Sequence, residues 1–134
     1  MKKRNVLAIL VAGTLASLTF NLQAAEKSAA YKQGKKIYKS QCTACHQKKG
    51  QGIPGVFPPL AGSDYLLADK ERAINVPLKG LTGKITVNGQ DYNSSMPAFG
   101  HLTDDKLAAV MTYVMTAWGN EGEVVTADEV AKLR

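Results

Sequence analysis

The sequence predicts an all-α domain that carries one small β-hairpin. Apolar residues recur with helical spacing near both ends of the chain, over residues 28–40 and 103–118. Strand signals are confined to one short segment around an Asn-Gly pair, residues 85–92. A long stretch at residues 48–62 is irregular in composition yet rich in apolar residues. A core built around a bound apolar group would explain such a stretch.

The first 25 residues are predicted to be a secretory signal peptide (residues 1–25) rather than part of the fold. Basic residues at positions 2–4 precede an apolar run over 6–20, and small residues follow at 24 and 25. The apolar run is 15 residues long, shorter than the roughly 20 that a membrane-spanning helix needs. We therefore predict cleavage after residue 24 or 25 and a soluble, periplasmic domain over 26–134, without stable membrane insertion. The alternative is an uncleaved N-terminal anchor that faces the periplasm.

Charge is distributed unevenly along the chain. The formal charge of +6 includes three cations of the signal, which leaves 14 − 11 = +3 for the remainder. Residues 27–49 hold seven lysines and no acid, whereas residues 119–134 carry four acids against two cations. The basic stretch is either a solvated helix face or a docking surface for an acidic partner. Nucleic acid is not an expected partner, because aromatic residues do not interleave the lysines.

The first predicted helix covers residues 28–40 and should end at or just before the cysteines. Gly34 is either a weak point of this helix or a place where another helix approaches closely. Residues 48–62 contain four glycines and three prolines, so they should form a loop. The apolar residues of this loop indicate that it wraps over another part of the domain.

The middle of the chain is predicted to form two short helices and the hairpin. Ser63 is a suitable N-cap for a helix over 63–69. A second helix follows around residues 70–78 and should be disturbed by Pro77. The hairpin over 85–92 then leads directly into a polar loop.

Two further helices complete the prediction. Thr103 is expected to cap a long helix with acidic residues in its first turn, and Gly119 to end it. Its apolar residues fall on one stripe: Leu107, Val110, Met111, Val114, Met115 and Trp118. A last short helix is predicted to begin at Thr126.

The segment QCTACHQ, residues 41–47, holds both cysteines and one of the two histidines of the chain. A thioredoxin-like dithiol would need a preceding strand, which the pattern does not predict, and a plain disulfide leaves His46 unexplained. A zinc site would need His101 as a fourth donor, and adjacent Cys45 and His46 bind one tetrahedral ion poorly. Cys-x-x-Cys-His is instead the attachment signature of c-type haem. Two thiols add to the two vinyl groups of the porphyrin, and the histidine binds the iron.

A sixth iron ligand, if there is one, should come from the residues downstream. Met111 and Met115 lie four apart on the inward stripe of the long helix, which is typical of core methionines. Met96 lies in the polar loop SSMPAF, where an exposed thioether would be wasted unless it were used. His101 is the rival ligand, and otherwise a surface histidine. We therefore predict Met96 as the distal ligand.

On these motifs the sequence resembles class I cytochromes c. The likeness includes the small bacterial cytochromes and the haem domains joined to nitrite reductases, alcohol dehydrogenases and terminal oxidases. The matching stretches are CTACH, GVFPPLAGSDYL, ITVNGQDYNSSMPAFGHLTDDKLAAVMTYV and WGN. The resemblance implies a small cytochrome c fold over residues 26–134. Its helices would pack around one covalently bound haem, with the hairpin before the distal methionine loop.

The resemblance also implies a role for individual residues of the haem site. Cys42 and Cys45 would form the thioethers, His46 would be the proximal ligand and Met96 the distal ligand. The carbonyl group of Pro58 would accept a hydrogen bond from the second ring nitrogen of His46.

Residues around this site receive packing roles from the same resemblance. Leu60 would press on the porphyrin. Gly34 and Tyr113 would lie where the first and last long helices cross, while Phe99 and Trp118 would serve in packing.

The implied function is one-electron transfer without catalysis, because two protein ligands leave the iron no free position. The expected partners are periplasmic or membrane redox proteins with acidic docking surfaces, and the expected state is a monomer. One alternative is a haem subunit permanently docked in a dehydrogenase, reductase or oxidase complex. Another is an open-site haem enzyme or gas binder.

Overall fold

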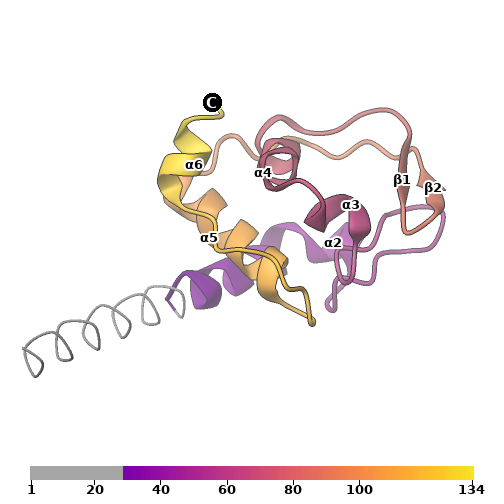
Figure 1. Ribbon diagram of the computed structural model, residues 1–134, viewed down its shortest axis with the longest axis horizontal. Coiled ribbons are helices and arrows are strands. Elements are labelled where there is room, and N and C mark those ends of the chain that lie inside the picture. Colours follow the sequence, from indigo (N-terminus) through magenta and orange to yellow (C-terminus); the bar gives the residue numbers. More distant parts are fainter. Residues whose placement is uncertain (1–28) are drawn as a thin grey trace, which may run out of the picture.

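The computed structural model describes residues 29–134, and the predicted signal peptide lies outside them. Residues 29–41 are helical. The elements that follow are α2 (Thr43–His46), α3 (Asp64–Leu67), α4 (Lys70–Lys79), β1 (Ile85–Val87), β2 (Gln90–Tyr92), α5 (Asp104–Thr116) and α6 (Ala127–Ala131). This content confirms the predicted all-α domain with one small hairpin (Figure 1). Within the described part of the chain, no helix is long and apolar enough to span a membrane.

The helical stretch 29–41 crosses α5 at close range (Figure 1). Gly34 is buried at the crossing, where an added Cβ would collide with the carbonyl oxygen of Ala109 and lie 2.8 Å from the Cβ of Tyr113. A helix with a glycine here can therefore approach closer than one with any side chain. The expectation that Gly34 and Tyr113 mark the helix crossing is confirmed.

Four aromatic rings pack around this crossing. The ring centroid of Tyr113 lies 5.0 to 5.4 Å from those of Tyr31, Tyr38 and Trp118. The centroids of Tyr38 and Trp118 are 5.0 Å apart. Tyr38 is almost fully buried, and its hydroxyl donates to the carbonyl oxygen of Gln47 at 2.7 Å. Trp118 therefore has the packing role that was predicted for it.

The long helix α5 begins as predicted and ends earlier. The Thr103 side chain accepts the N–H of Lys106, and acidic residues occupy the first turn. The helix ends at Thr116 rather than next to Gly119, because Ala117 is extended and Trp118 has a φ of 56°. The carbonyl oxygens freed at this end accept from the side chain of Asn120 and the backbone of Gly122, at 2.8 and 2.9 Å.

The two short helices of the middle region form where the sequence predicts them. Ser63 caps α3 by accepting the N–H of Leu66 at 3.1 Å. The prediction that Pro77 disturbs α4 is wrong. Pro77 lies inside the last turn, and the helix continues to Lys79. Gly80 closes the turn by donating to Val76 at 2.8 Å.

The hairpin forms as predicted and is tied to α3. Strands β1 and β2 pair antiparallel, with Asn88 and Gly89 both at positive φ in the two-residue turn. The side chain of Asp64 accepts the N–H of Asn88 at 2.7 Å, and the side chain of Asn88 accepts the N–H of Asp64 at 3.0 Å. This reciprocal pair fixes the hairpin at the end of the molecule away from α6 (Figure 1).

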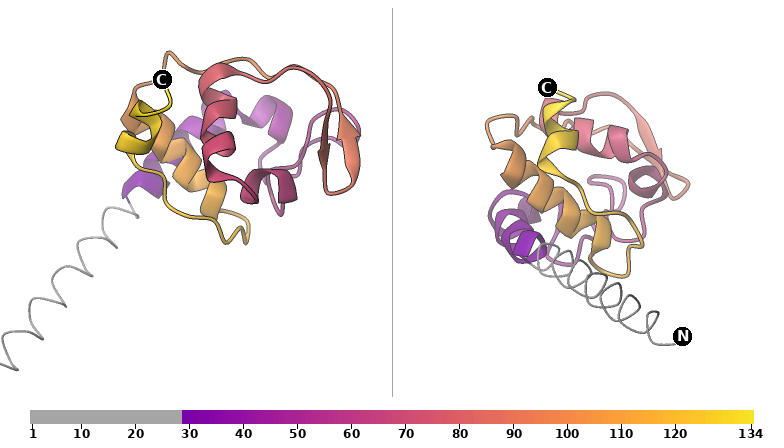
Figure 2. Two further views of the ribbon diagram at one scale, coloured as in Figure 1. Left: turned by 45° about the horizontal axis from the view of Figure 1, so that its top comes forward. Right: turned by 60° about the vertical axis from the view of Figure 1, so that its left-hand side comes forward.

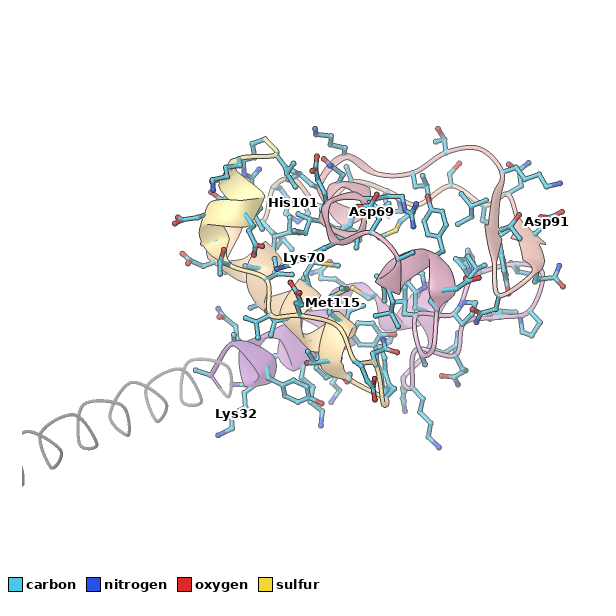
Figure 3. All side chains as sticks on the ribbon, in the orientation of Figure 1. Lys32, Asp69, Lys70, Asp91, His101 and Met115 are labelled. Carbon is cyan, nitrogen blue, oxygen red and sulfur yellow. The ribbon has the colours of Figure 1, made fainter. Side chains whose placement is uncertain are left out.

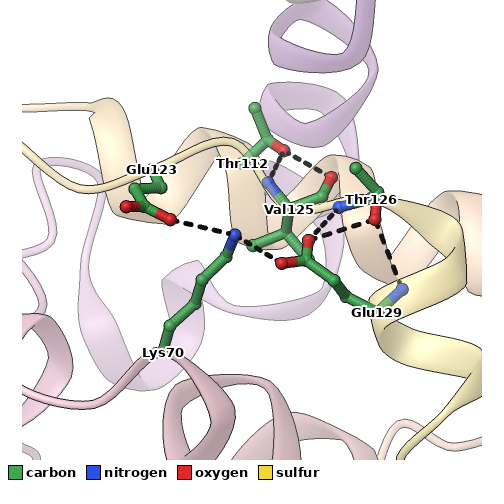
Figure 4. A network of polar contacts seen from close by, with 6 residues as sticks. All are labelled: Lys70, Thr112, Glu123, Val125, Thr126 and Glu129. Atoms are coloured by element: carbon green, nitrogen blue, oxygen red, sulfur yellow. Dashed lines mark hydrogen bonds and ion pairs between the residues drawn. The ribbon is translucent and has the colours of Figure 1, made fainter.

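The segment after α5 runs back along that helix to α6 (Figure 2). The side chain of Thr112, which is fully buried, bonds both backbone groups of Val125, at 3.0 and 3.1 Å. Thr126 and Glu129 form a capping box at the start of α6, which confirms the predicted helix start. Figure 4 shows how Lys70 joins this segment to α4, with its ammonium 2.6 Å from Glu129 and 3.2 Å from Glu123.

Neutralising Glu129 is expected to remove a small, pH-dependent part of the stability. The hydrogen bond from Lys70 holds the pKa of Glu129 below its usual range. A depressed carboxyl pKa stabilises the fold above the unfolded value of about 4.3, and this contribution is lost as pH falls through the folded value. Because the pair is partly exposed, Glu129→Gln should lower the free energy of unfolding at pH 7 by about 1 kcal/mol or less.

Denaturant unfolding of the two proteins at pH 7 and pH 3 measures this effect. Glutamine retains the capping box, so the substitution isolates the charge. The difference between the two proteins should be smaller at pH 3 than at pH 7. The exposed Glu121 provides the control, since Glu121→Gln should leave stability unchanged at both pH values. An equal loss at both pH values would contradict the charge-based explanation.

Candidate functional site

One turn of helix positions the three residues of the Cys-x-x-Cys-His motif. The helix that starts the described chain ends at residue 41, as predicted, and α2 follows after a turn at Cys42. The backbone N–H of His46 donates to the carbonyl oxygen of Cys42 at 3.0 Å, which places the two residues on one side of the turn. Cys42, Cys45 and His46 all line a single cavity.

His46 is buried, and its contact with Pro58 indicates which of its two ring nitrogens carries the hydrogen. Its Nδ1 lies 3.0 Å from the carbonyl oxygen of Pro58. A carbonyl oxygen only accepts, so Nδ1 carries the hydrogen and Nε2 keeps its lone pair. Burial lowers the pKa of His46, only partly opposed by this hydrogen bond, so the ring is neutral at neutral pH. A neutral imidazole with a free Nε2 is the form that binds a metal ion.

The loop that carries Pro58 is held by backbone contacts to its own start. The N–H groups of Leu60 and Ala61 both donate to the carbonyl oxygen of Gly50, at 2.7 and 2.9 Å. Gly52 has a φ of 64°, and a Cβ there would lie 2.7 Å from the carbonyl oxygen of Pro58. The loop is therefore irregular and packed, as its composition predicts, and both Pro58 and Leu60 line the cavity.

The cavity contains about 1170 Å³ of empty space, part of it open to solvent. Most of the lining side chains are apolar. The walls come from the helical stretch 29–41, α2, the loop 48–62, α3, α4, the hairpin, the loop that carries Met96, and α5. The predicted core thus has a large hollow at its centre rather than a closed interior. A hollow with so apolar a lining is typical of a site for an apolar prosthetic group.

Met96 enters this cavity from the loop after the hairpin. Its backbone makes an isolated bridge with Leu81, with N···O distances of 2.8 and 3.0 Å. This bridge ties the Met96 backbone to the chain just after α4, and the Met96 side chain lies on the cavity wall.

The rival ligands are distributed differently. His101 is exposed and does not line the cavity, and Figure 3 places it at the α6 end of the molecule. The four donors of a zinc site are therefore not gathered in one place. Met115 is buried in the core, as predicted. Met111 is buried as well, and it also forms part of the cavity wall.

The two cysteines are half-buried free thiols. Burial raises the pKa of the Cys42 thiol to about 11, and the neighbouring Cys45 adds to this effect. Disulfide exchange requires a thiolate. A thiol that stays protonated at neutral pH therefore disfavours a redox dithiol.

An arginine beside the cavity has an unused hydrogen-bond donor. The guanidinium of Arg72 stacks 4.1 Å above the ring of Tyr65, which lines the cavity, and donates to the Tyr65 carbonyl oxygen. Its Nε is buried and has no acceptor among the described residues. Arg72 itself is not among the residues that line the cavity, so it supports the wall from behind Tyr65. No pattern in the sequence had predicted a role for Arg72.

Asn120 is a second residue that was not predicted from the sequence. Its buried side chain donates to the carbonyl oxygens of Leu60 and Val114, at 3.0 and 2.8 Å, and accepts the N–H of Gly62 at 2.8 Å. Asn120 thus joins the loop 48–62 to the end of α5. The stretch WGN, which matches class I cytochromes c, includes Asn120, but the sequence did not predict a role for it.

The residues around the cavity fit a covalently attached haem. Two neighbouring thiols, a neutral imidazole with a free nitrogen and a thioether all face an apolar hollow.

Comparison with known proteins identifies the family. Residues 31–118 match the family model for cytochrome c. The chain is 43% identical to a cytochrome c-552 of Thermus thermophilus, over 98% of this chain and 86% of that protein. It is 48% identical to a second Thermus thermophilus cytochrome c-552, over 75% of this chain and 83% of that protein.

Larger proteins also contain a similar segment. The cytochrome c subunit of the quinone alcohol dehydrogenase from Gluconobacter oxydans is 34% identical over 75% of this chain, which corresponds to 22% of the subunit. These relatives are named as cytochromes or cytochrome subunits. The chain therefore belongs to the cytochrome c family, as a class I protein with one covalently bound haem c, and it is an electron carrier rather than an enzyme.

Proposed function

We propose that the protein is a mobile one-electron carrier in which His46 and Met96 would be the two protein ligands of the haem iron. Cys42 and Cys45 would form the thioether bonds. The observation that carries this proposal is that all four side chains line one apolar cavity, while His101 does not. The haem supplies a one-electron couple between ferric and ferrous iron.

The protein groups set the potential at which this electron moves. The Met96 thioether favours the ferrous state and raises the potential. The bond from His46 Nδ1 to the Pro58 carbonyl orients the ring and increases its basicity. Leu60 and the other apolar side chains of the wall exclude water, which disfavours the additional positive charge of the ferric state. With two protein ligands, no position remains for a substrate.

The relatives favour a freely diffusing carrier over a docked subunit. This chain spans most of the cytochromes c-552 but only 22–25% of the dehydrogenase subunits that it resembles. We propose a periplasmic monomer with redox proteins as partners. A permanently docked subunit remains the second candidate, because the dehydrogenase subunits contain a similar segment.

The basic stretch provides a docking surface for such partners in this proposal. Lys32, Lys35, Lys36 and Lys39 are exposed at i, i+3, i+4 and i+7, so they form one helix face on the side away from Gly34. Figure 3 shows Lys32 on the outer side of this helix. An acidic partner would be attracted over a distance by this face. A fall in the rate of electron transfer with rising ionic strength tests this attraction.

The test of the iron ligands is the near-infrared spectrum of the ferric holoprotein. Methionine bound to ferric haem gives a weak charge-transfer band there. We expect the band at neutral pH, together with no binding of carbon monoxide to the ferrous protein. A spectrum without the band, combined with rapid carbon monoxide binding, would favour the open-site enzyme or gas binder instead.

A further inference from the structure

The loop between Met96 and α5 is held on one side by α4. The backbone of Met96 pairs with Leu81 just after this helix. The N–H of Phe99 donates to the carbonyl oxygen of Pro77 in its last turn at 2.7 Å. A Cβ at Gly100 would lie 2.9 Å from the carbonyl oxygen of Leu78, so the loop also lies directly against the helix end.

The other side of this loop is held by Arg134. Its Nη1 donates to the carbonyl oxygen of Gly100 at 2.7 Å, and its Nη2 donates to that of Leu102 at 2.5 Å. Its Nε binds the carboxylate of Asp104 in the first turn of α5 at 2.5 Å. The planar guanidinium thus spans the end of the loop with donors on three separate nitrogen atoms, whereas a lysine ammonium has only one nitrogen.

The segment that precedes Arg134 is packed against the core, which holds Arg134 near the loop. In the preceding helix α6, Val130 is fully buried, and Leu133, just after the helix, packs against the core. The capping box of Thr126 and Glu129 fixes the start of the same helix. Figure 2 shows the end of the chain beside the loop that leads into α5.

The loop forms part of the cavity wall as well as carrying Met96. Phe99 and Leu102 both line the cavity, and the N–H of Leu102 donates to the carbonyl oxygen of Phe99 at 2.9 Å. A movement of Gly100 and Leu102 away from Arg134 would therefore move side chains that line the cavity.

We propose that Arg134 is a positioning residue for Met96, which keeps the loop closed and the thioether on the iron. The proposal rests on the proposed function, in which Met96 is the distal ligand. The bonds from Arg134 to Gly100 and Leu102 exist only when the loop is closed. Their loss shifts the equilibrium toward the open loop, in which the iron is free to take another ligand.

Binding of imidazole to the ferric holoprotein tests this role, because imidazole enters only when Met96 leaves. In Arg134→Ala the apparent affinity for imidazole should rise about tenfold, as expected for the loss of charge-assisted hydrogen bonds at an exposed site. Arg134→Lys keeps the positive charge but loses the planar set of guanidinium donors, so its affinity for imidazole should rise less than that of Arg134→Ala. Asp104→Asn removes only the ion pair and should leave imidazole binding close to that of the wild type.

Lys132 provides the matched control, because it is exposed and its side chain has no hydrogen-bond partner among the described residues. Lys132→Ala removes one positive charge from the same segment and should not change imidazole binding. Equal binding by wild type, Arg134→Ala and Arg134→Lys would overturn the proposal, as would an equal rise in Lys132→Ala. A wild-type protein without the near-infrared band would overturn the assignment of Met96 itself, so the two failures are distinguishable.

Discussion

Replacing Met96 by alanine is expected to abolish the near-infrared band of the ferric protein and to lower the reduction potential. Alanine removes the thioether that stabilises ferrous iron, and water or another ligand would take its place. A fall on the order of 0.1 V is expected, a modest part of the roughly 0.8 V that axial ligands can span. Redox titration of the purified holoprotein, followed by its absorption spectrum, measures both changes.

The second methionine on the cavity wall provides the control for this experiment. Met111 is buried in α5 and lines the same cavity, so Met111→Leu keeps its volume while removing the sulfur. The band and the potential should remain in this variant. Loss of the band in Met111→Leu and its retention in Met96→Ala would mean that Met111, rather than Met96, is the distal ligand. His101→Ala should change neither property, since His101 does not line the cavity.

The part of the site that depends on local sequence was predictable. Cys42, Cys45 and His46 are adjacent in the chain, and one turn of helix is enough to bring them together. The Asn-Gly turn likewise predicts the hairpin, because two residues at positive φ favour that pair. The contact of His46 with Pro58 joins residues twelve positions apart, and the expectation of it came from the family resemblance rather than from the local pattern.

The contacts that the sequence did not predict are those between distant parts of the chain. Asn120 reaches Leu60 across 60 positions, and Arg134 reaches Gly100 across 34. Neither side chain belongs to a periodic pattern or a spaced motif, so nothing in the local sequence identifies its partner. The early end of α5 involves the same side chain, because Asn120 also binds the carbonyl group of Val114, which a longer helix would have used.

The substitution of Gly34 by alanine is expected to cause the largest loss of stability. Alanine is the better helix former by about 1 kcal/mol, so an isolated helix would gain from the change. In the folded protein the new methyl group would collide with the backbone of Ala109, which is fixed inside α5 and has no rotamer to change. Separating the two helices would also disturb the ring packing of Tyr113. We expect a net loss of about 3 kcal/mol in the free energy of unfolding, near the upper end for overpacking.

Denaturant unfolding of the holoprotein measures this loss. Gln33→Ala, on the exposed side of the same helix, should change the free energy of unfolding by less than about 0.5 kcal/mol. The reduction potential of Gly34→Ala should stay near that of the wild type, because Gly34 does not line the cavity. A Gly34→Ala protein as stable as the wild type would mean that the helices do not meet at this glycine. A stable protein with an altered potential would mean that the helix crossing influences the iron site directly.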